Sequence, residues 1–227
     1  MKIGILGTSM VGQTLSGKLA ELGHEVVVGT RDVAQTLART EPHPYGLPAF
    51  SVWHQEHPTV TLGTFADAAR HGEVVLNATN GTGSLAALQQ AGADHLNGKI
   101  LIDIAVPLDF SQGMPPALSV CNTDSLGEQI QRAYPAVKVV KALNTVTAFL
   151  MINPGLVGGG DHTLFVCGNA ADAKAEVIGW LADWFGWKDV LDLGDITNAR
   201  GTEMYLPLWL RVWGKLGTGL FNVKVVR

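Results

Sequence analysis

A chain of 227 residues accommodates one large domain, or a domain with a smaller appendage, since domains usually have roughly 100 to 200 residues. Apolar residues make up 47% of the chain and charged residues only 16%, which excludes a disordered protein and indicates much buried sheet. The 16 Lys and Arg against 20 Asp and Glu leave a net charge of -4 with no basic run, so we expect no nucleic-acid partner.

The sequence also lacks the signals of secretion or membrane insertion. Cys121 and Cys167 match no metal or redox spacing, which is typical of reduced thiols in a cytoplasmic protein. The N-terminal apolar run ends at a glycine turn after Leu6 and is too short for a signal peptide. Charged residues interrupt the apolar stretches 137–152 and 204–221, so we expect a cytoplasmic chain that does not interact with a membrane.

From the N-terminus onward, short β-branched runs alternate with helical patterns. Strands are predicted at 2–6, 25–28, 59–62, 73–77, 99–104 and 138–142, with a helix at 10–22 and others between the later strands. Capping-box spacings predict helices that begin after Asp32, Thr64 and Ser125. Residues 41–58 contain four prolines and are expected to form an inserted surface loop. The alternation predicts an α/β fold, namely a Rossmann-type doubly wound parallel sheet.

After Asn144 the pattern changes, because "NPGLVGGG" is typical of a connector. A strand at 163–167, a helix at 170–185 and a strand at 189–192 then predict a smaller C-terminal α/β lobe, residues 146–227, beside a main domain of residues 1–145. Five of the six tryptophans fall in this lobe, which favours a pocket wall or a subunit contact. Trp180 and Trp184 lie at helical spacing and fit ordinary core packing equally well.

The stretch "GTSMVG" at residues 7–12 follows the first predicted strand and opens a helix. It matches the dinucleotide-binding pattern G-x-G-x-x-G except at its middle position, where Ser9 replaces glycine. Gly7 permits the tight turn, Gly12 allows the helix to approach the strand, and the free N–H groups of the first helical turn bind pyrophosphate. The Cβ of Ser9 costs some close approach, but its hydroxyl can donate to a phosphate oxygen. We interpret the loop as a working cofactor site.

The end of the second predicted strand distinguishes between the two dinucleotides. NAD-binding sites usually place Asp or Glu there, to accept from the ribose 2′-hydroxyl. This chain has Thr30 and Arg31, a hydroxyl and a guanidinium that suit the 2′-phosphate of NADP. Asp32 competes for the ribose, but its spacing to Gln35 assigns it to a helix cap. The sequence therefore predicts NADP.

Other combinations of polar residues are weaker candidates for a catalytic or metal site. Tyr134 and Lys138 have the spacing of a reductase acid pair, but Pro135 argues against the shared helix that this pair needs. His54 and His57 could share a helical face, yet no third ligand lies near them in sequence, so we predict no metal site. No nucleophile motif is present. We therefore assign no catalytic acid or base.

The segments "GTSMVG", "GHEVVVGTRD", "VVKALNTV" and "LFVCGN" resemble the coenzyme F420-dependent NADP oxidoreductase family over nearly the whole chain. The resemblance implies NADP as cofactor and coenzyme F420, a deazaflavin, as redox partner. It also implies three groups of cofactor-binding residues: a pyrophosphate loop, a 2′-phosphate site and a nicotinamide end. These are Gly7, Thr8, Ser9, Met10, Val11 and Gly12; Thr30, Arg31 and Gln35; and Asn77, Ala78, Thr79, Ala105, Pro107 and Asn144. Gln35 stands where relatives often carry a lysine.

Direct hydride transfer between two rings requires no proton at the reacting carbon, which accounts for the missing acid and base. Met204, Leu208 and Trp209 are the candidate wall on the deazaflavin side, although the same residues could form a homodimer interface. Two other functions stay open. An NADPH-dependent imine or ketone reductase would use Tyr205 as proton donor, and a non-catalytic NADP(H) sensor would bind the dinucleotide without turnover. An open apolar cavity over the nicotinamide would favour an enzyme, whereas a space filled by side chains would favour the sensor.

Overall fold

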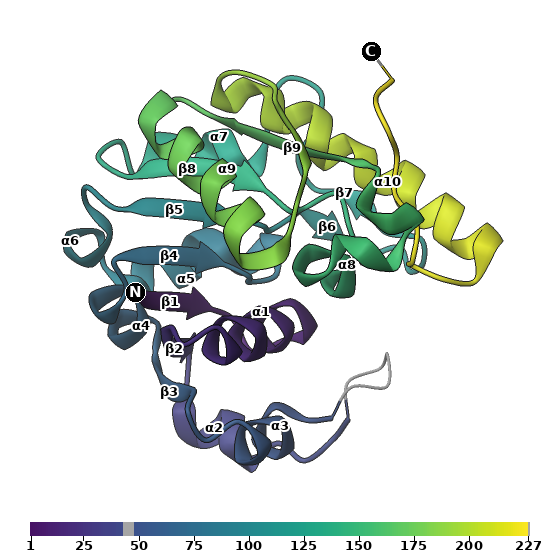
Figure 1. The fold of residues 1–227 in the computed structure, drawn as a ribbon. Helices are drawn as coiled ribbons and strands as arrows, with labels where there is room; N and C mark the ends of the chain where they lie inside the picture. The colour runs from purple at the N-terminus through teal and green to yellow at the C-terminus, as the bar shows by residue number, and fades with distance from the viewer. Residues whose placement is uncertain (43–47, 227) are drawn as a thin grey trace.

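The computed structural model describes residues 1–42 and 48–226 (Figure 1). Its first unit is β1 (Lys2–Leu6), α1 (Met10–Glu21) and β2 (Glu25–Thr30), close to the predicted bounds. Side chains of β1 and β2 are buried on both faces of the sheet: Ile3 and Val26 join one core cluster, and Leu6 and Val27 join the other. A parallel sheet covered on both faces needs such nearly continuous apolar strands.

The main sheet has eight strands in the order β10-β9-β8-β5-β4-β1-β2-β3. The remaining strands are β3 (Thr61–Thr64), β4 (Val74–Asn77), β5 (Ile100–Asp103), β8 (Lys138–Ala142), β9 (Thr163–Gly168) and β10 (Asp189–Asp192). In this sheet, β3, β2, β1, β4, β5 and β8 are parallel to one another. Strand β9 pairs antiparallel with β8. The chain first builds the sheet on one side of β1, through β2 and β3, and then crosses to the other side, where β4 pairs with β1. This is the doubly wound Rossmann topology that the sequence predicted.

Helices cover both faces of this sheet (Figure 1). Residues of α1, α8 (Ala148–Ile152) and α9 (Ala171–Phe185) join one core cluster. Residues of α4 (Phe65–His71), α5 (Ser84–Ala91), α6 (Ala93–Leu96) and α7 (Leu126–Ala133) join the other. The caps at Asp32, Thr64 and Ser125 are confirmed, because each side chain accepts a hydrogen bond from the backbone three residues on.

Residues after 145 extend the same sheet rather than forming one of their own, because β9 and β10 continue from β8. The division at residue 145 stays a prediction. The connector forms two 3₁₀ turns, Pro154–Leu156 and Gly158–Gly160, and a third, Ile196–Asn198, precedes the long helix α10 (Ala199–Leu216). Trp180 and Trp184 stack on each other and pack, half-buried, against the core, so the core interpretation holds for this pair.

The predicted insertion at 41–58 is only partly a loop. Residues 43–47 lie outside the described residues, and α3 (Phe50–Glu56) follows the short α2 (Val33–Ala38). The surface-loop prediction was wrong for α3, because Phe50 and Trp53 are three residues apart and give the helix a buried face. Trp53 and His57 lie against Gly17 of α1.

Candidate functional site

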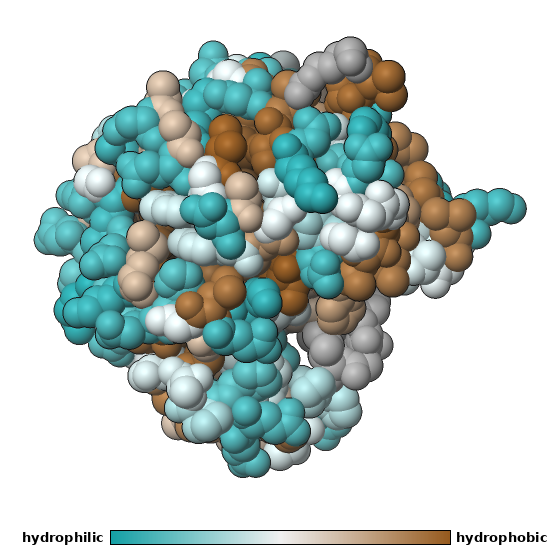
Figure 2. Space-filling view, in the orientation of Figure 1, coloured by the Kyte–Doolittle hydropathy of each residue, from teal (hydrophilic) through white to brown (hydrophobic). Residues whose placement is uncertain are grey.

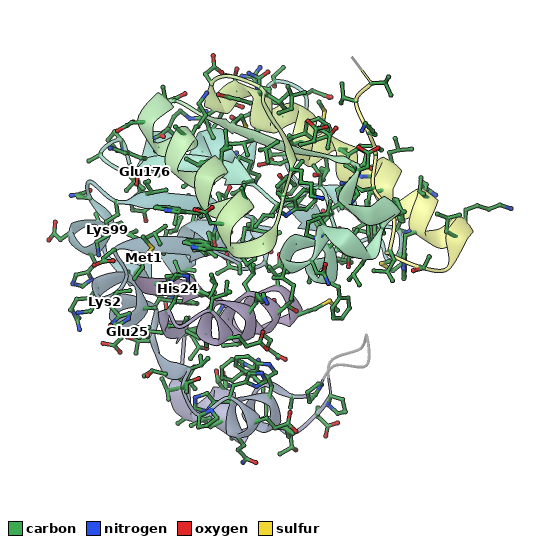
Figure 3. All side chains as sticks on the ribbon, viewed as in Figure 1. Met1, Lys2, His24, Glu25, Lys99 and Glu176 are labelled. Atoms are coloured by element: carbon green, nitrogen blue, oxygen red, sulfur yellow. The ribbon has the colours of Figure 1, made fainter. Side chains whose placement is uncertain are left out.

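An open cleft of about 700 Å³ lies at the carboxyl ends of the parallel strands. It spans the crevice between β1 and β4, the position where doubly wound sheets bind their ligands. Residues at the opposite edge, among them Lys2, Glu25 and Lys99, stand at the amino ends of the strands (Figure 3). Most of the predicted cofactor residues line the cleft, and they are Gly7, Thr8, Ser9, Met10, Val11, Thr30, Arg31, Gln35, Ala78, Thr79, Ala105 and Asn144.

The glycine loop is built so that the two retained glycines cannot be replaced. Gly7 has φ +118°, and a Cβ there would meet the carbonyl oxygen of Ala78 at 2.6 Å. A Cβ on Gly12 would collide with the carbonyl oxygen of Gly7, so Gly12 lies beneath the loop rather than in the cleft lining. The side chain of Gln13, itself buried, donates to the carbonyl oxygen of Thr8 (3.1 Å). These contacts together fix the backbone conformation of the loop.

The N-terminus of α1 leaves its donors available to a ligand. Ser9 is the N-cap residue, but its side chain makes no capping hydrogen bond, and no acidic residue lies in the first turn. The first N–H groups of a helix have no partner within the helix and lie at the positive end of its dipole. An anion in the cleft can accept from these N–H groups and from the free hydroxyl of Ser9. The loop thus fits a pyrophosphate.

Replacing Ser9 tests this placement. We expect Ser9→Gly to bind NADP about as well as the parent, because easier backbone approach offsets the lost hydroxyl. Ser9→Val should bind much more weakly, because a branched side chain without a donor would stand against the pyrophosphate. Isothermal titration calorimetry with NADP⁺ measures both. Tolerance of the valine would mean that the phosphates lie elsewhere.

The predicted 2′-phosphate residues stand together at one end of the cleft. The hydroxyls of Thr30 and Thr36 are 2.7 Å apart in a buried hydrogen bond. Asp32 accepts from the backbone N–H of Gln35 (2.9 Å) as the cap of α2, as its spacing predicted. Arg31 is exposed at the mouth. Sequence reasoning missed a second guanidinium in the lining, that of Arg39, although it follows Gln35 at helical spacing.

Asn77 and Pro107 are placed differently from the other predicted residues. Asn77 is fully buried below the cleft, where its amide donates to Asp103 (2.8 Å) and accepts from the hydroxyl of Thr79 (2.6 Å). It orients Thr79 rather than lining the cleft. Pro107 lines a neighbouring pocket of about 230 Å³. Asn77 is still the last residue of β4, whereas Ala78 and Thr79 follow the strand and reach the cleft.

Asn144 presents an unpaired amide to the cleft. Its side chain is 4% exposed, and within the described chain neither its Nδ2 nor its Oδ1 has a hydrogen-bond partner. Leu143 before it has φ +64°, an uncommon conformation for a branched residue. A buried amide without partners is costly, and a ligand that both donates and accepts would relieve that cost. This donor–acceptor pair fits the carboxamide of a nicotinamide.

A buried ion-pair network supports this end of the cleft from below. The Nζ of Lys141 lies 2.9 Å from Asp103 and 2.7 Å from Glu203, and it also donates to the carbonyl oxygen of Ala105. Burial alone lowers the pKa of Lys141, but the two carboxylates outweigh it and the pKa is raised. Glu203 accepts from the backbone N–H groups at the start of α7 as well. The network therefore ties β5, β8, α7 and α10 together.

The wall of the cleft beyond Asn144 is apolar. It consists of Ile104, Val106, Leu108, Phe110, Val146, Met151 and Leu206; Leu108 belongs to the hairpin strand β6 (Leu108–Asp109), which pairs with β7 (Ala117–Leu118). The sequence prediction of Met204, Leu208 and Trp209 for this wall was wrong. Positions 204 and 208 lie on the opposite side of α10 from Leu206 and are exposed. Trp209 instead stacks on Phe221 at 5.2 Å.

Charged groups gather at one end of the cleft only. Among the described lining residues, the charged ones are Arg31, Asp32 and Arg39, all at the 2′-phosphate end. Tyr205, the predicted donor of a reductase, is outside this lining, and burial raises the pKa of its hydroxyl. Tyr134 ends α7 whereas Lys138 begins β8, so the two do not share a helix.

His54 of α3 and His57, the residue that follows this helix, are accounted for by backbone contacts. The Nε2 of His54 donates to the carbonyl oxygen of Val60 (2.8 Å), and the Nδ1 of His57 donates to that of Trp53 (2.8 Å). In residues 1–42 and 48–226 there is no group of three His, Cys, Asp or Glu side chains placed to hold a metal ion. None of the described helices combines the length and the apolar character needed to cross a membrane.

Known proteins similar to this chain include F420-dependent NADP reductases. Residues 2–107 match the family described as NADP oxidoreductase coenzyme F420-dependent. A crystal structure from Arthrobacter sp. FB24, described as a proposed F420-dependent NADP-reductase, is 60% identical, has a TM-score of 0.96 and is covered over 100% of both chains. The F420-dependent NADP reductase of Methanothermobacter marburgensis is 26% identical over 93% of this chain and 92% of its own.

Two further matches are covered over less of their own length. The metalloreductase STEAP3 of Rattus norvegicus is 30% identical over 97% of this chain, which spans only 40% of that protein. An imine reductase of Myxococcus stipitatus in complex with NADP⁺ is 15% identical with a TM-score of 0.64, over 96% of this chain and 63% of its own, and shares the fold alone. The 60% identity over both full lengths, together with a cleft suited to a phosphorylated dinucleotide, is decisive. The chain belongs to the coenzyme F420-dependent NADP oxidoreductases.

Proposed function

We propose that this NADP-dependent oxidoreductase transfers a hydride directly between NADP(H) and a flat deazaflavin, coenzyme F420. The observation that carries the proposal is the reacting end of the cleft, whose described lining is apolar or neutral with no titratable side chain. Hydride transfer from carbon to carbon requires no general acid or base at the reacting carbon, and the proton that the reduced deazaflavin takes up at a ring nitrogen can come from water. The relative from Methanothermobacter marburgensis is named an F420-dependent NADP reductase, which supports the choice of redox partner.

The residues would act by binding and positioning. The loop at 7–12 would hold the pyrophosphate, Thr30 and Arg31 the 2′-phosphate, and Asn144 the carboxamide of the nicotinamide. Nicotinamide supplies the hydride-carrying carbon when the cofactor is bound. The apolar wall around Met151 and Leu206 would exclude water and hold a second ring against the first. Such proximity contributes roughly 7 to 11 kcal/mol in favourable intramolecular reactions.

Stopped-flow mixing of the protein with NADPH and oxidised coenzyme F420 tests the proposal. We expect the deazaflavin absorbance to fall, and deuterium placed on C4 of NADPH to appear on the deazaflavin ring. Tight NADPH binding without any change of deazaflavin absorbance would reject this function. An imine or ketone substrate turned over in its place would support the reductase alternative.

The Tyr205→Phe variant separates the two reactions. Tyr205 is half-buried outside the cleft lining, so we expect the rate with coenzyme F420 to stay within about twofold of the parent, because the hydride transfer needs no proton donor at the reacting carbon and water can supply the proton for the ring nitrogen. A reductase of imines or ketones that used Tyr205 as its acid would lose substantial rate. Single-turnover rates at saturating NADPH make the comparison, with the parent as control.

We also propose that two copies of the chain pair through α10. From Met204 to Val226 no residue is buried, and Leu208 and Leu216 are 58% and 56% exposed. Apolar side chains gather over this helix in the space-filling view (Figure 2). Exposed apolar surface of this extent marks an interface, and pairs of identical chains are the commonest oligomers. Light scattering should give the mass of a dimer for the parent and of a monomer for Leu208→Lys; a monomeric parent would reject the pairing.

A further inference from the structure

We infer that Arg39 is a second guanidinium of the 2′-phosphate subsite and helps the protein to select NADP over NAD. Arg39 follows the last residue of α2, and its side chain lines the cleft together with Thr30, Arg31 and Gln35. The inference rests on NADP as the cofactor and is independent of the second substrate.

Gln35 holds the guanidinium in place. The Nη2 of Arg39 donates to the Oε1 of Gln35 (3.2 Å), one helical turn earlier in the chain. A neutral amide orients the guanidinium without neutralising it, and the remaining N–H groups stay available to a ligand. With described residues, neither Arg31 nor Arg39 forms an ion pair. Two guanidinium groups thus stand at this end of the cleft without an ion-pair partner among the described residues.

The inserted segment fixes the backbone at this position. Ser51 of α3, only 8% exposed, donates from its hydroxyl to the carbonyl oxygen of Arg39 (2.5 Å). α3 itself is anchored by Trp53, which is buried against α1. The chain end of α2 is therefore tethered to the body of the protein. This gives the insertion a role, because it sets where Arg39 enters the cleft.

Charge explains why this arrangement would select one dinucleotide. The 2′-phosphate is a dianion near neutral pH, whereas NAD presents a hydroxyl at the same place. Asp32 also lines this end, and its carboxylate favours a hydroxyl over a phosphate. A single guanidinium would only cancel Asp32. With Arg31 and Arg39 together the subsite has a net positive charge, which favours the phosphate.

Calorimetry with two fragments of the cofactor tests the inference on the full chain. Adenosine 2′,5′-bisphosphate carries the 2′-phosphate, and 5′-AMP lacks it. We expect Arg39→Ala to weaken binding of the bisphosphate by roughly tenfold and to leave 5′-AMP unchanged, as loss of one charge-assisted contact predicts. Gln35→Glu should also weaken only the bisphosphate, because a carboxylate would pair with Arg39 and add negative charge.

Arg70→Ala is the matched control, since Arg70 is an exposed arginine that pairs with Asp67 on α4 away from the cleft lining. It should bind both fragments like the parent. Equal losses for the two fragments, or no loss, in Arg39→Ala would overturn the role of Arg39. A parent that binds both fragments equally well would overturn the whole 2′-phosphate subsite, Arg39 included. Neither result depends on whether coenzyme F420 is the second substrate.

Discussion

Replacing Lys141 by Met is expected to lower the free energy of unfolding by about 3 to 5 kcal/mol, as removal of one partner of a buried ion pair does. Lys141 is 1% exposed and its Nζ lies between Asp103 and Glu203, both of them buried. The methionine would fill the space of the stem but leave two carboxylates without their cation. Urea unfolding followed by tryptophan fluorescence measures the loss.

The pH dependence of this variant identifies the cause. A buried carboxylate without a cation binds a proton more readily when folded than when unfolded, so acid relieves the strain on the folded state. The destabilisation relative to the parent should therefore be smaller at pH 5 than at pH 8. A packing defect alone would give the same loss at both values.

Lys138→Met on the same strand is the control. Lys138 pairs with Asp172 at 2.6 Å, but the two side chains are 39% and 64% exposed, so its loss should cost at most about 1 kcal/mol. If Lys141→Met were no more damaging than this control, the buried network would contribute little to the fold. The expected contrast follows from burial, since both lysines have a close carboxylate partner.

Arg31→Ala is expected to weaken NADPH binding by roughly tenfold to a hundredfold and to leave NADH binding almost unchanged. The reason is the loss of a charge-assisted contact of about 1.5 to 3 kcal/mol that only the 2′-phosphate can make. Arg31 is exposed at the cleft mouth, and its removal should not disturb the fold. Calorimetry with both cofactors makes the measurement. Equal losses for NADPH and NADH would contradict the assignment of Arg31 to the phosphate.

Adding the Arg39→Ala change tests whether the two guanidinium groups act together. If both contact the same phosphate, the double variant should lose its preference for NADPH, and NADH binding should remain near that of the parent. If the double variant kept the full preference for NADPH, the 2′-phosphate could not bind at this end of the cleft.

Local patterns in the sequence were sufficient for the strands of the main sheet, for several helix starts and for the turn at residues 7–12. β1 and β8 begin and end at the predicted residues, and the cap of α4 forms between Thr64 and Asp67 as predicted. These features depend on residues within a few positions of each other, whose spacing alone decides strand periodicity or a helix start. The positive φ of Gly7 and the close approach of Gly12 to Gly7 belong to the same class, whereas the contact of Gly7 with Ala78 joins distant segments.

Tertiary structure decided the features that join distant segments. Lys141 and Asp103 are 38 residues apart and meet only because β5 and β8 are neighbours in the sheet. The rotation of α10 places Leu206 in the cleft and Met204 outside it, and the packing of α3 brings Ser51 to the backbone of Arg39. Strand order, helix rotation and the position of an insertion follow from the packing of the whole chain. No pattern of residue types within one segment contains them, which is why sequence alone predicted candidate phosphate ligands but not the residues that hold them in place.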